Sequence, residues 1–500
     1  MGRNRKGILH SSPFFVRTIL IKTLGIEYLG VNSLFTAVLQ VLNLTELGFG
    51  SAAIFAMYKP IAEDDYSTVG AILFYLRKVY KYIGIIIMGI GICFIPFLKY
   101  LISDHVSVDI NITILFLIYL FNTAISYFLF AHKKSLLIAL QCNHMVSKVN
   151  YFVNTSLYLL QMLVLFIIPN YYIYVLLIPI STIISNMICS YIVDTKYGQW
   201  LVKTQLSPLI AKKIKAKLFP LMSSKLAGVF IHSTDTLVIS SFLGLKETAI
   251  YSNYYYIITA VCSIIIVAQE AMQSGIGNAL VVDSHDKIMG DFKLFGFINN
   301  WIAVVCTTCL LCLYQPFMEI WVGKNLILPF KMVILFCAYF YSIIAIRIPV
   351  IYRDAAGIWK EDMLRCYLSC LLNIILNIIL VQHIGLYGAI VSSVLVGLLI
   401  DPWIAKTLYQ VVFNGSSRHF YFQYLKTLII TFIIGSICFH ICYITFDGIW
   451  GLLLKLIVCI TLPNILLYLL YKNDEQFLCF KKWILCKWRG FKSKSGGRNQ

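Results

Sequence analysis

The sequence predicts an all-α polytopic membrane protein with about 14 transmembrane helices. Of its 500 residues, 60% are hydrophobic and only 13% are charged, and the mean hydropathy is +0.82. These values lie far outside the range of water-soluble globular proteins. Apolar runs of about 20 residues, the length that crosses a hydrocarbon core of roughly 30 Å, recur along the whole chain. A water-soluble fold is therefore excluded.

Fourteen such runs account for most of the chain, and no connection between them is long enough, or suitably patterned, to form a soluble catalytic domain. They extend over residues 8–24, 31–57, 80–101, 110–130, 146–168, 171–192, 219–242, 249–271, 296–315, 331–352, 363–382, 386–408, 424–443 and 449–471.

An internal repeat predicts the domain organisation. Leu24-Gly25 begins a short loop that leads into a helix reaching Glu46, and Leu243-Gly244 does the same before a helix that reaches Glu270, at an offset of 219 residues. Repeats in the same orientation are typical of two pseudo-symmetric six-helix bundles with a site between them. The predicted parts are an N-terminal bundle (1–192), a basic cytoplasmic linker (193–218), a C-terminal bundle (219–408), two additional helices (409–471) and a basic cytoplasmic tail (472–500).

The distribution of positive charge predicts the orientation. With the amino terminus inside, 32 of the 41 Lys and Arg residues lie in or beside cytoplasmic segments. Short loops rich in Lys and Arg are retained in the cytoplasm, so we expect both termini to be cytoplasmic. The net charge of +19 is spread over these loops and the tail, which favours contact with anionic membrane lipid over nucleic acid.

Cysteine usage gives no evidence of a cofactor or a metal site. Cys306, Cys309 and Cys312 have a spacing like that of an iron–sulfur ligand set. They lie inside an apolar run, however, and no fourth ligand follows nearby. Most of the 15 cysteines fall in predicted helices, where a thiol behaves as a small hydrophobic group. We therefore predict neither cofactor nor metal.

Ionisable residues inside apolar runs are the main functional signal, because each costs roughly 2.5 to 3.5 kcal/mol at a helix centre on insertion scales. Most of them fall on the first, second, seventh and eighth predicted helices. The full set is Arg17, Glu46, Lys225, Asp235, Glu270, Arg347, Asp401 and Lys455.

Helical periodicity aligns these residues with other polar side chains. At about 100° per residue, one face of the second helix and one face of the seventh helix are polar, and the eighth helix has a similar face that includes Glu270. Such groups can simply join helices together, but a water-filled pathway also explains the length of each polar face. The two faces comprise Asn32, Thr36, Gln40, Asn43, Glu46 and Gly50, and Lys225, Gly228, His232 and Asp235.

Several motifs resemble a known transporter family. They are Leu24-Gly-Ile-Glu-Tyr-Leu-Gly-Val-Asn-Ser-Leu-Phe, Glu46-Leu-Gly-Phe-Gly-Ser-Ala, Trp321-Val-Gly, Arg353-Asp-Ala-Ala-Gly-Ile-Trp and Gly385-Leu-Tyr-Gly-Ala-Ile. Because these motifs occur in this order, the chain resembles the Wzx-type oligosaccharide repeat-unit flippases. These flippases belong to the multidrug/oligosaccharidyl-lipid/polysaccharide exporter superfamily.

The resemblance implies translocation of an undecaprenyl-diphosphate-linked oligosaccharide from the inner to the outer leaflet of the bacterial cytoplasmic membrane, for capsule, O-antigen or exopolysaccharide assembly. The mix of basic and acidic residues on these helices predicts alternating access coupled to a proton or sodium ion, and a polymerase and glycosyltransferases are the expected assembly partners. The candidate diphosphate-binding residues are Arg17, Lys225 and Arg347. The candidate sugar-binding residues are Asn32, Gln40, Asn43 and His232, and the candidate ion-coupling residues are Glu46, Asp235 and Glu270.

Two rival classes stay open. A multidrug or small-molecule cation-coupled antiporter of the same superfamily would confer drug resistance rather than alter surface glycan. A membrane glycosyltransferase or repeat-unit polymerase would need an outer loop with catalytic charges, and the longest outer connection, 316–330, offers only Glu319 and Lys324. We therefore expect a transporter and not an enzyme.

Overall fold

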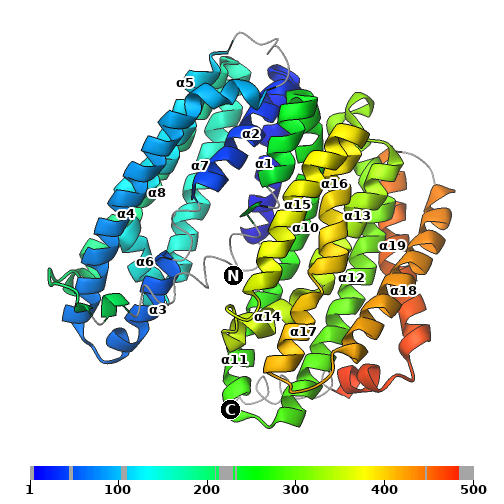
Figure 1. The fold of residues 1–500 in the computed structure, drawn as a ribbon. Coiled ribbons are helices and arrows are strands. Elements are labelled where there is room, and N and C mark those ends of the chain that lie inside the picture. The colour runs from blue at the N-terminus through cyan, green and yellow to red at the C-terminus, as the bar shows by residue number, and fades with distance from the viewer. Residues whose placement is uncertain are drawn as a thin grey trace, which may run out of the picture. The chain divides into compact units, whose positions relative to one another are not determined.

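The computed structural model describes residues 5–43, 49–102, 110–208, 210–212, 229–230, 233–444 and 448–482, and these ranges contain helices and no strand (Figure 1). Within them, ten helices are long and apolar enough to cross a membrane, or eleven if the pair Ile112–Phe128 and Ala131–Ala139, bent by 54°, is one span. The predicted all-α polytopic fold class is confirmed.

The helices agree with eleven of the fourteen predicted runs. The run 8–24 corresponds to α1 (Arg5–Thr23), which is helical but less apolar than the spans. The run 31–57 corresponds to two shorter helices, α2 (Ile26–Leu42) and α3 (Phe49–Ala62). Only part of the run 219–242 lies within the described residues, where 233–243 are helical.

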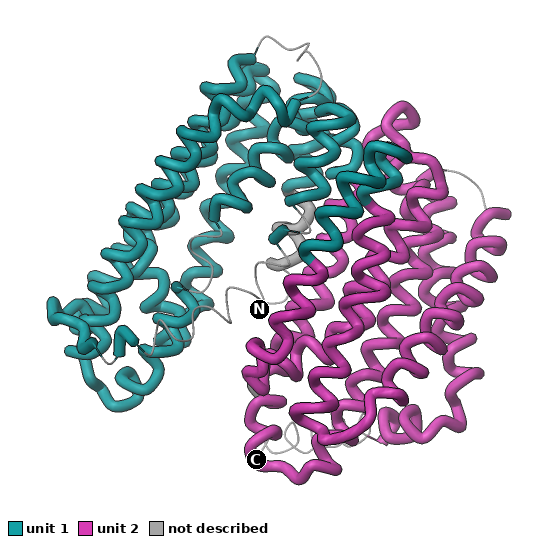
Figure 2. The backbone as a smooth tube through the Cα atoms, in the orientation of Figure 1, with its two compact units in different colours: residues 1–253, 370–389 teal, residues 254–369, 390–500 magenta. Residues whose placement is uncertain are grey.

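The chain forms two compact units, coloured separately in Figure 2. Unit 1 contains residues 1–253 and 370–389, and unit 2 contains residues 254–369 and 390–500. Helix α10 (Leu245–Glu270) and helix α15 (Met363–Ile384) each contribute residues to both units. The bundle boundaries expected from the sequence repeat stay a prediction.

Unit 1 is built mainly from long helices that enclose one apolar core. Residues such as Leu34, Phe35, Ile72, Phe116 and Leu136 in this core are fully excluded from solvent. After α1, α2 and α3, its further elements are α4 (Tyr66–Phe94), η2 (Ile95–Tyr100), α5 (Ile112–Phe128), α6 (Ala131–Ala139), α7 (Asn143–Ile167), α8 (Tyr171–Lys196) and η3 (Gly198–Trp200).

The start of α4 explains why its predicted run, 80–101, was too short. Asp65 caps the helix by accepting a hydrogen bond from the backbone N–H of Thr68 at 2.9 Å, as Asp commonly does at a helix N-terminus. Its N-terminal half carries Arg77 and Lys78, which lower the hydropathy without ending the helix.

Unit 2 contains most of the later helices and two further apolar clusters, one of which joins α12, α18 and α19. The described helix 233–243, residues 370–384 of α15 and residues 386–389 of α16 belong to unit 1. Its elements are most of α10, then α11 (Gln273–Val282), α12 (His285–Val322), η4 (Lys324–Leu326), α13 (Phe330–Ala345), α14 (Arg347–Ala356), α16 (Leu386–Leu395), η5 (Val396–Ile400), α17 (Trp403–Val411), α18 (Arg418–Tyr443) and α19 (Gly448–Tyr471).

Two proline positions divide helices in unit 2 that the sequence predicts to be continuous. Pro349 lacks the N–H that would bond to the carbonyl of Ala345, where α13 ends, and it is accommodated in the first turn of α14. Pro402 directly precedes α17, and η5 before it is a π-helical turn. At both positions, the α-helix is interrupted close to a proline, which has no backbone N–H to donate.

The two glycines of the sequence repeat occupy equivalent turns. Gly25 and Gly244 have φ angles of 114° and 93°, a region that is strained for residues with a side chain. Their N–H groups donate to the carbonyls of Leu20 and Ile239, each five residues earlier, at 3.3 and 3.2 Å. The local backbone therefore ends the preceding helix in the same way at both positions.

Candidate functional site

Arg17 projects from α1 toward α10 within unit 1. Its Nη1 donates to the side-chain oxygen of Asn253 at 3.3 Å and to the backbone carbonyl of Ser252 at 3.4 Å. The side chain is half-buried. Both of these contacts are long and use neutral acceptors, which a guanidinium can satisfy alongside other hydrogen bonds.

The three candidate sugar-binding amides of α2 each accept a hydrogen bond from a hydroxyl group of another helix. The hydroxyl of Tyr119 donates to the Asn32 side chain at 2.5 Å, and that of Tyr127 donates to Asn43 at 3.2 Å. Ser233 donates to the Gln40 side chain at 3.3 Å. The polar face of α2 thus also joins helices within unit 1, as the alternative interpretation proposed.

Asp235 is a buried carboxylate that accepts hydrogen bonds from described side chains of two other helices in unit 1. Only 1% of the residue is exposed. The hydroxyl of Tyr251 in α10 donates to its Oδ2 at 2.7 Å, and the amide of Asn377 in α15 donates to its Oδ1. These hydrogen bonds fix the position of a buried acidic side chain between α10 and α15.

In unit 2, the candidate diphosphate residue Arg347 pairs with the candidate coupling residue Glu270. Arg347 Nη2 lies 3.4 Å from Glu270 Oε1, and the two side chains are 16% and 56% exposed. The pair can open when an anion competes for the guanidinium, because it is long and partly solvated. The predicted Glu46, Lys225 and His232 lie outside the described residues.

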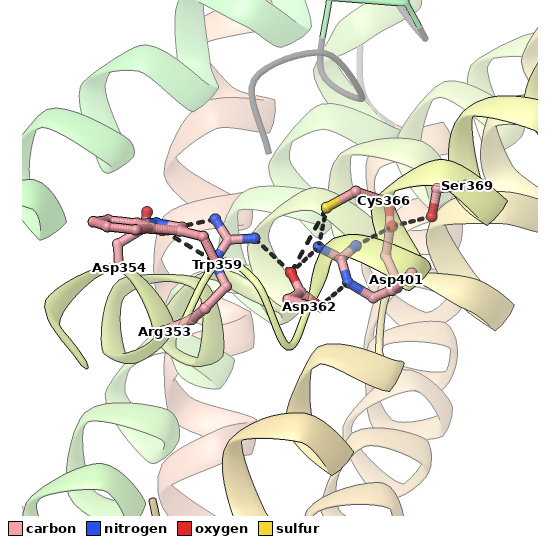
Figure 3. Close-up of polar contacts among 8 residues, drawn as sticks. Arg353, Asp354, Trp359, Asp362, Cys366, Ser369 and Asp401 are labelled. Atoms are coloured by element: carbon pink, nitrogen blue, oxygen red, sulfur yellow. Dashed lines mark hydrogen bonds and ion pairs between the residues drawn. The ribbon is translucent and has the colours of Figure 1, made fainter. Parts of the chain in front are cut away.

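A buried network of ionised side chains lies where α14, α15 and the residues before α17 approach one another in unit 2 (Figure 3). At its centre, Arg365 makes two parallel hydrogen bonds to Asp362, each 2.7 Å long. The same guanidinium reaches Asp401 at 2.7 Å, and Asp401 also accepts a hydrogen bond from Ser369 at 2.9 Å. Arg365 thus connects the start of α15 to the start of α17.

The network extends from Asp362 to α14. Arg353 Nη1 lies 2.6 Å from Asp362, and its Nη2 lies 2.7 Å from Asp354. Trp359 also donates to Asp354, at 2.9 Å. The side chains of Arg353, Asp362 and Arg365 are only 7%, 1% and 9% exposed. Charge-assisted bonds of this density stabilise one arrangement of the three segments, because a single missing partner leaves a buried charge uncompensated.

Sequence reasoning identified two parts of this network without connecting them. Arg353 belongs to a motif of the family resemblance, and Asp401 was recognised as an ionisable residue in an apolar run. Arg365 was counted only among the positive charges that set the orientation. A clear signal was available, since Asp362 and Arg365 are spaced i and i+3 at the start of a helix, where such pairs meet.

The network controls the titration of Asp362. Burial alone would raise the pKa of this carboxyl, but the hydrogen bond from Arg365 and the charges of Arg365 and Arg353 outweigh it, so the pKa lies below its ordinary value. A carboxyl with a depressed folded-state pKa stabilises the fold above its unfolded pKa of about 4, and this stability is lost as the pH falls through the folded-state pKa.

We therefore expect the thermal stability advantage of the wild type over Asp362→Asn to be full at pH 7 and to shrink below about pH 4. Thermal unfolding of the detergent-solubilised protein, followed by intrinsic fluorescence, measures it. Glu361→Gln is the matched control, because Glu361 is the exposed neighbour. A difference between wild type and Asp362→Asn that did not change with pH would contradict this assignment.

A cavity of about 100 Å³ lies within unit 2, lined mainly by residues of α12 and α18, many of them aromatic or amide side chains. Lys293, His419 and Asp474 are also at its wall. Among the described residues, no candidate site residue from the sequence lines this cavity. It is therefore separate from the polar positions described above.

Comparisons with known proteins identify the fold. A scan of protein-family models and a search of curated protein sequences give no match. Among solved structures, the chain is similar to the lipid II flippase MurJ in an inward closed conformation, with a TM-score of 0.67 and 14% identity over 94% of this chain and 98% of that one. The fold is that of this flippase.

The same fold occurs in multidrug transporters. A Vibrio cholerae MATE transporter matches with a TM-score of 0.53 and 13% identity, over 81% of this chain and 99% of that one. An outward-facing multidrug resistance MATE family transporter of the MOP superfamily matches with a TM-score of 0.52 and 14% identity, over 82% of this chain and 94% of that one. With its apolar helices, this fold identifies a multi-pass membrane protein.

Proposed function

We propose that the protein is a lipid-linked oligosaccharide flippase, which moves undecaprenyl-diphosphate-linked repeat units from the inner to the outer leaflet of the bacterial cytoplasmic membrane. The observation that carries the proposal is the extent of the match to the lipid II flippase, 94% of this chain and 98% of that one. The MATE transporters correspond to only 81–82% of the chain. The motifs that resemble Wzx-type flippases support the same class.

The chemistry of such a substrate agrees with the polar residues inside the helices. A sugar chain on a diphosphate cannot cross hydrocarbon unaided, because its hydroxyls and charges would lose hydration. Cations bind the diphosphate, and amides and imidazole bind the sugar. We assign the first role to Arg17, Lys225 and Arg347, and the second to Asn32, Gln40, Asn43 and His232.

We further propose alternating access driven by an ion gradient, with Glu46, Asp235 and Glu270 binding a proton or sodium ion. Both termini are cytoplasmic in this scheme. The flippase supplies repeat units to a polymerase and receives them from glycosyltransferases. The exported units serve capsule, O-antigen or exopolysaccharide assembly.

A cation-coupled multidrug antiporter is the second candidate, favoured by the similarity to the MATE transporters. A deletion strain separates the two. If the flippase proposal is correct, deletion removes surface glycan, the intact gene restores it, and drug resistance is unchanged. Loss of drug resistance with normal surface glycan would reject the flippase in favour of the antiporter.

For the diphosphate assignment, we expect Arg17→Ala to reduce surface glycan several-fold at equal protein abundance. Arg17→Lys should retain part of the activity, because the positive charge survives although the planar fork does not. Lys246→Ala, which removes an exposed charge, is the matched control. Quantitative glycan labelling and immunoblotting give the two readouts. Full glycan export by Arg17→Ala would exclude Arg17 from the diphosphate site.

A further inference from the structure

Three cysteines from three helices of unit 2 meet in its interior. They are Cys312 of α12, Cys442 of α18 and Cys459 of α19, and their sulfur atoms all lie within 4.8 Å of one another. The sulfur atoms of Cys442 and Cys459 are 3.7 Å apart. Each of the three residues is at most 5% exposed. The thiols of three residues that are far apart in the sequence therefore lie close together.

The surroundings of this thiol cluster are apolar and contain two more cysteines. Val304, Ile434 and Leu467 belong to the same buried cluster. Cys438, one helical turn before Cys442, is fully buried. Cys309 donates from its thiol to the carbonyl of Cys459 at 3.4 Å. Most of the atoms in this water-excluding region that could ligate a metal ion are therefore sulfur atoms.

The sulfur spacing matches a trigonal metal site. Three sulfur atoms placed about 2.3 Å from one metal ion, a typical metal–thiolate bond length, lie roughly 4.0 Å apart. The observed separations, 3.7 Å for one pair and no more than 4.8 Å for any pair, bracket this value. They are far longer than the roughly 2.05 Å of a disulfide bond. Small side-chain movements would complete the coordination without moving the helices.

A buried cation lies near the cluster. Lys455 is one helical turn before Cys459 on α19 and is only 7% exposed. Among the described residues it forms no ion pair with a carboxylate. A lysine at this depth is costly unless negative charge is near. Metal-bound thiolates on the same helix face would supply that charge.

We propose that Cys312, Cys442 and Cys459 form a binding site for one soft monovalent metal ion of the Cu⁺ class. Soft thiolate ligands select Cu⁺, whereas zinc in a structural site takes four ligands. Each thiol that coordinates as thiolate releases its proton to solvent, so binding weakens at low pH. The ion would cross-link α12, α18 and α19. This inference is independent of the transported substrate.

The test uses the full-length purified protein, reduced and kept anaerobic, titrated with Cu⁺ in competition with a chromophoric Cu⁺ chelator. We expect one ion per chain, and X-ray absorption should show only sulfur ligands at about 2.2 to 2.3 Å. Cys312→Ser and Cys459→Ser should each bind at least about 100-fold more weakly. Cys337→Ser is the matched control, because Cys337 is equally buried in α13.

Several results would overturn the proposal. They are unchanged affinity in both serine variants, nitrogen or oxygen ligands in the wild-type spectrum, and loss of binding only when the exposed Cys93 or Cys479 is replaced. Tighter binding of zinc with four ligands would reject the Cu⁺ assignment. A Cys442–Cys459 disulfide in protein isolated from cells would reject the site. If a serine variant fails to fold, the wild-type absorption spectrum and the rise of its Tm with Cu⁺ decide the question.

Discussion

Asp235→Asn should reduce ion-driven glycan export at least tenfold while leaving the abundance of the protein unchanged. Asparagine has nearly the same shape, and its oxygen can still accept the hydrogen bond from Tyr251, but it cannot bind a proton or cation by charge. The membrane potential supplies about 2.3 kcal/mol per charge moved through 100 mV. Loss of one coupled cation therefore removes well over a tenfold bias. Surface glycan labelling in the deletion strain measures the effect.

Two further variants define the origin of that loss. Tyr251→Phe removes one hydrogen bond to Asp235 and keeps the carboxylate, so it should retain part of the export. Glu63→Gln neutralises a carboxylate that is 59% exposed in a surface pair with Lys59, and it should export normally. Normal export by Asp235→Asn would assign Asp235 a structural role only.

Arg365→Gln should destabilise the protein by about 3–5 kcal/mol, the usual result of removing one partner from a buried ion pair. The substitution leaves Asp362 without its bidentate partner and Asp401 without its guanidinium. Both carboxylates are then buried with less compensation. Unfolding of the detergent-solubilised protein by denaturant gives the free energy directly.

Lys360→Gln is the control for this experiment, because it removes the same charge five residues earlier, at an exposed position just before α15. It should change the free energy of unfolding by less than about 0.5 kcal/mol. Equal stability of Arg365→Gln and Lys360→Gln would show that the network contributes little to folding.

Much of the fold could be predicted from composition, because spanning helices are specified by local apolarity. Eleven predicted runs correspond to helices for this reason. The breaks were harder to predict. Pro349 lies inside an apolar run that looks continuous. The break, with α13 ending at Ala345 and α14 beginning at Arg347, is visible only in the structure.

The candidate sites could be predicted less well, because they depend on contacts between distant segments. Periodicity placed Asn32, Gln40 and Asn43 on one face of α2, but the hydroxyls that donate to them come from other helices. Arg347 and Glu270 were assigned separate roles, although they form an ion pair.

The thiol cluster was out of reach for the same reason. Cys312 was set aside because no further ligand follows in sequence, while Cys442 and Cys459 approach it only through helix packing. Regular spacing along one helix is thus a poor guide to a site assembled from three.

The π-helical turn η5 changes the direction in which the side chains after it point around the helix axis. The N–H of Asp401 donates to the carbonyl of Val396, five residues earlier, at 3.1 Å. Such a turn holds one more residue than an α-helical turn, so all side chains beyond it are rotated by about 100° relative to an uninterrupted helix. Deleting a single residue from 396–400 would leave the composition almost unchanged, yet it would rotate the buried faces of Ile404 and Leu408 out of the interior of unit 2.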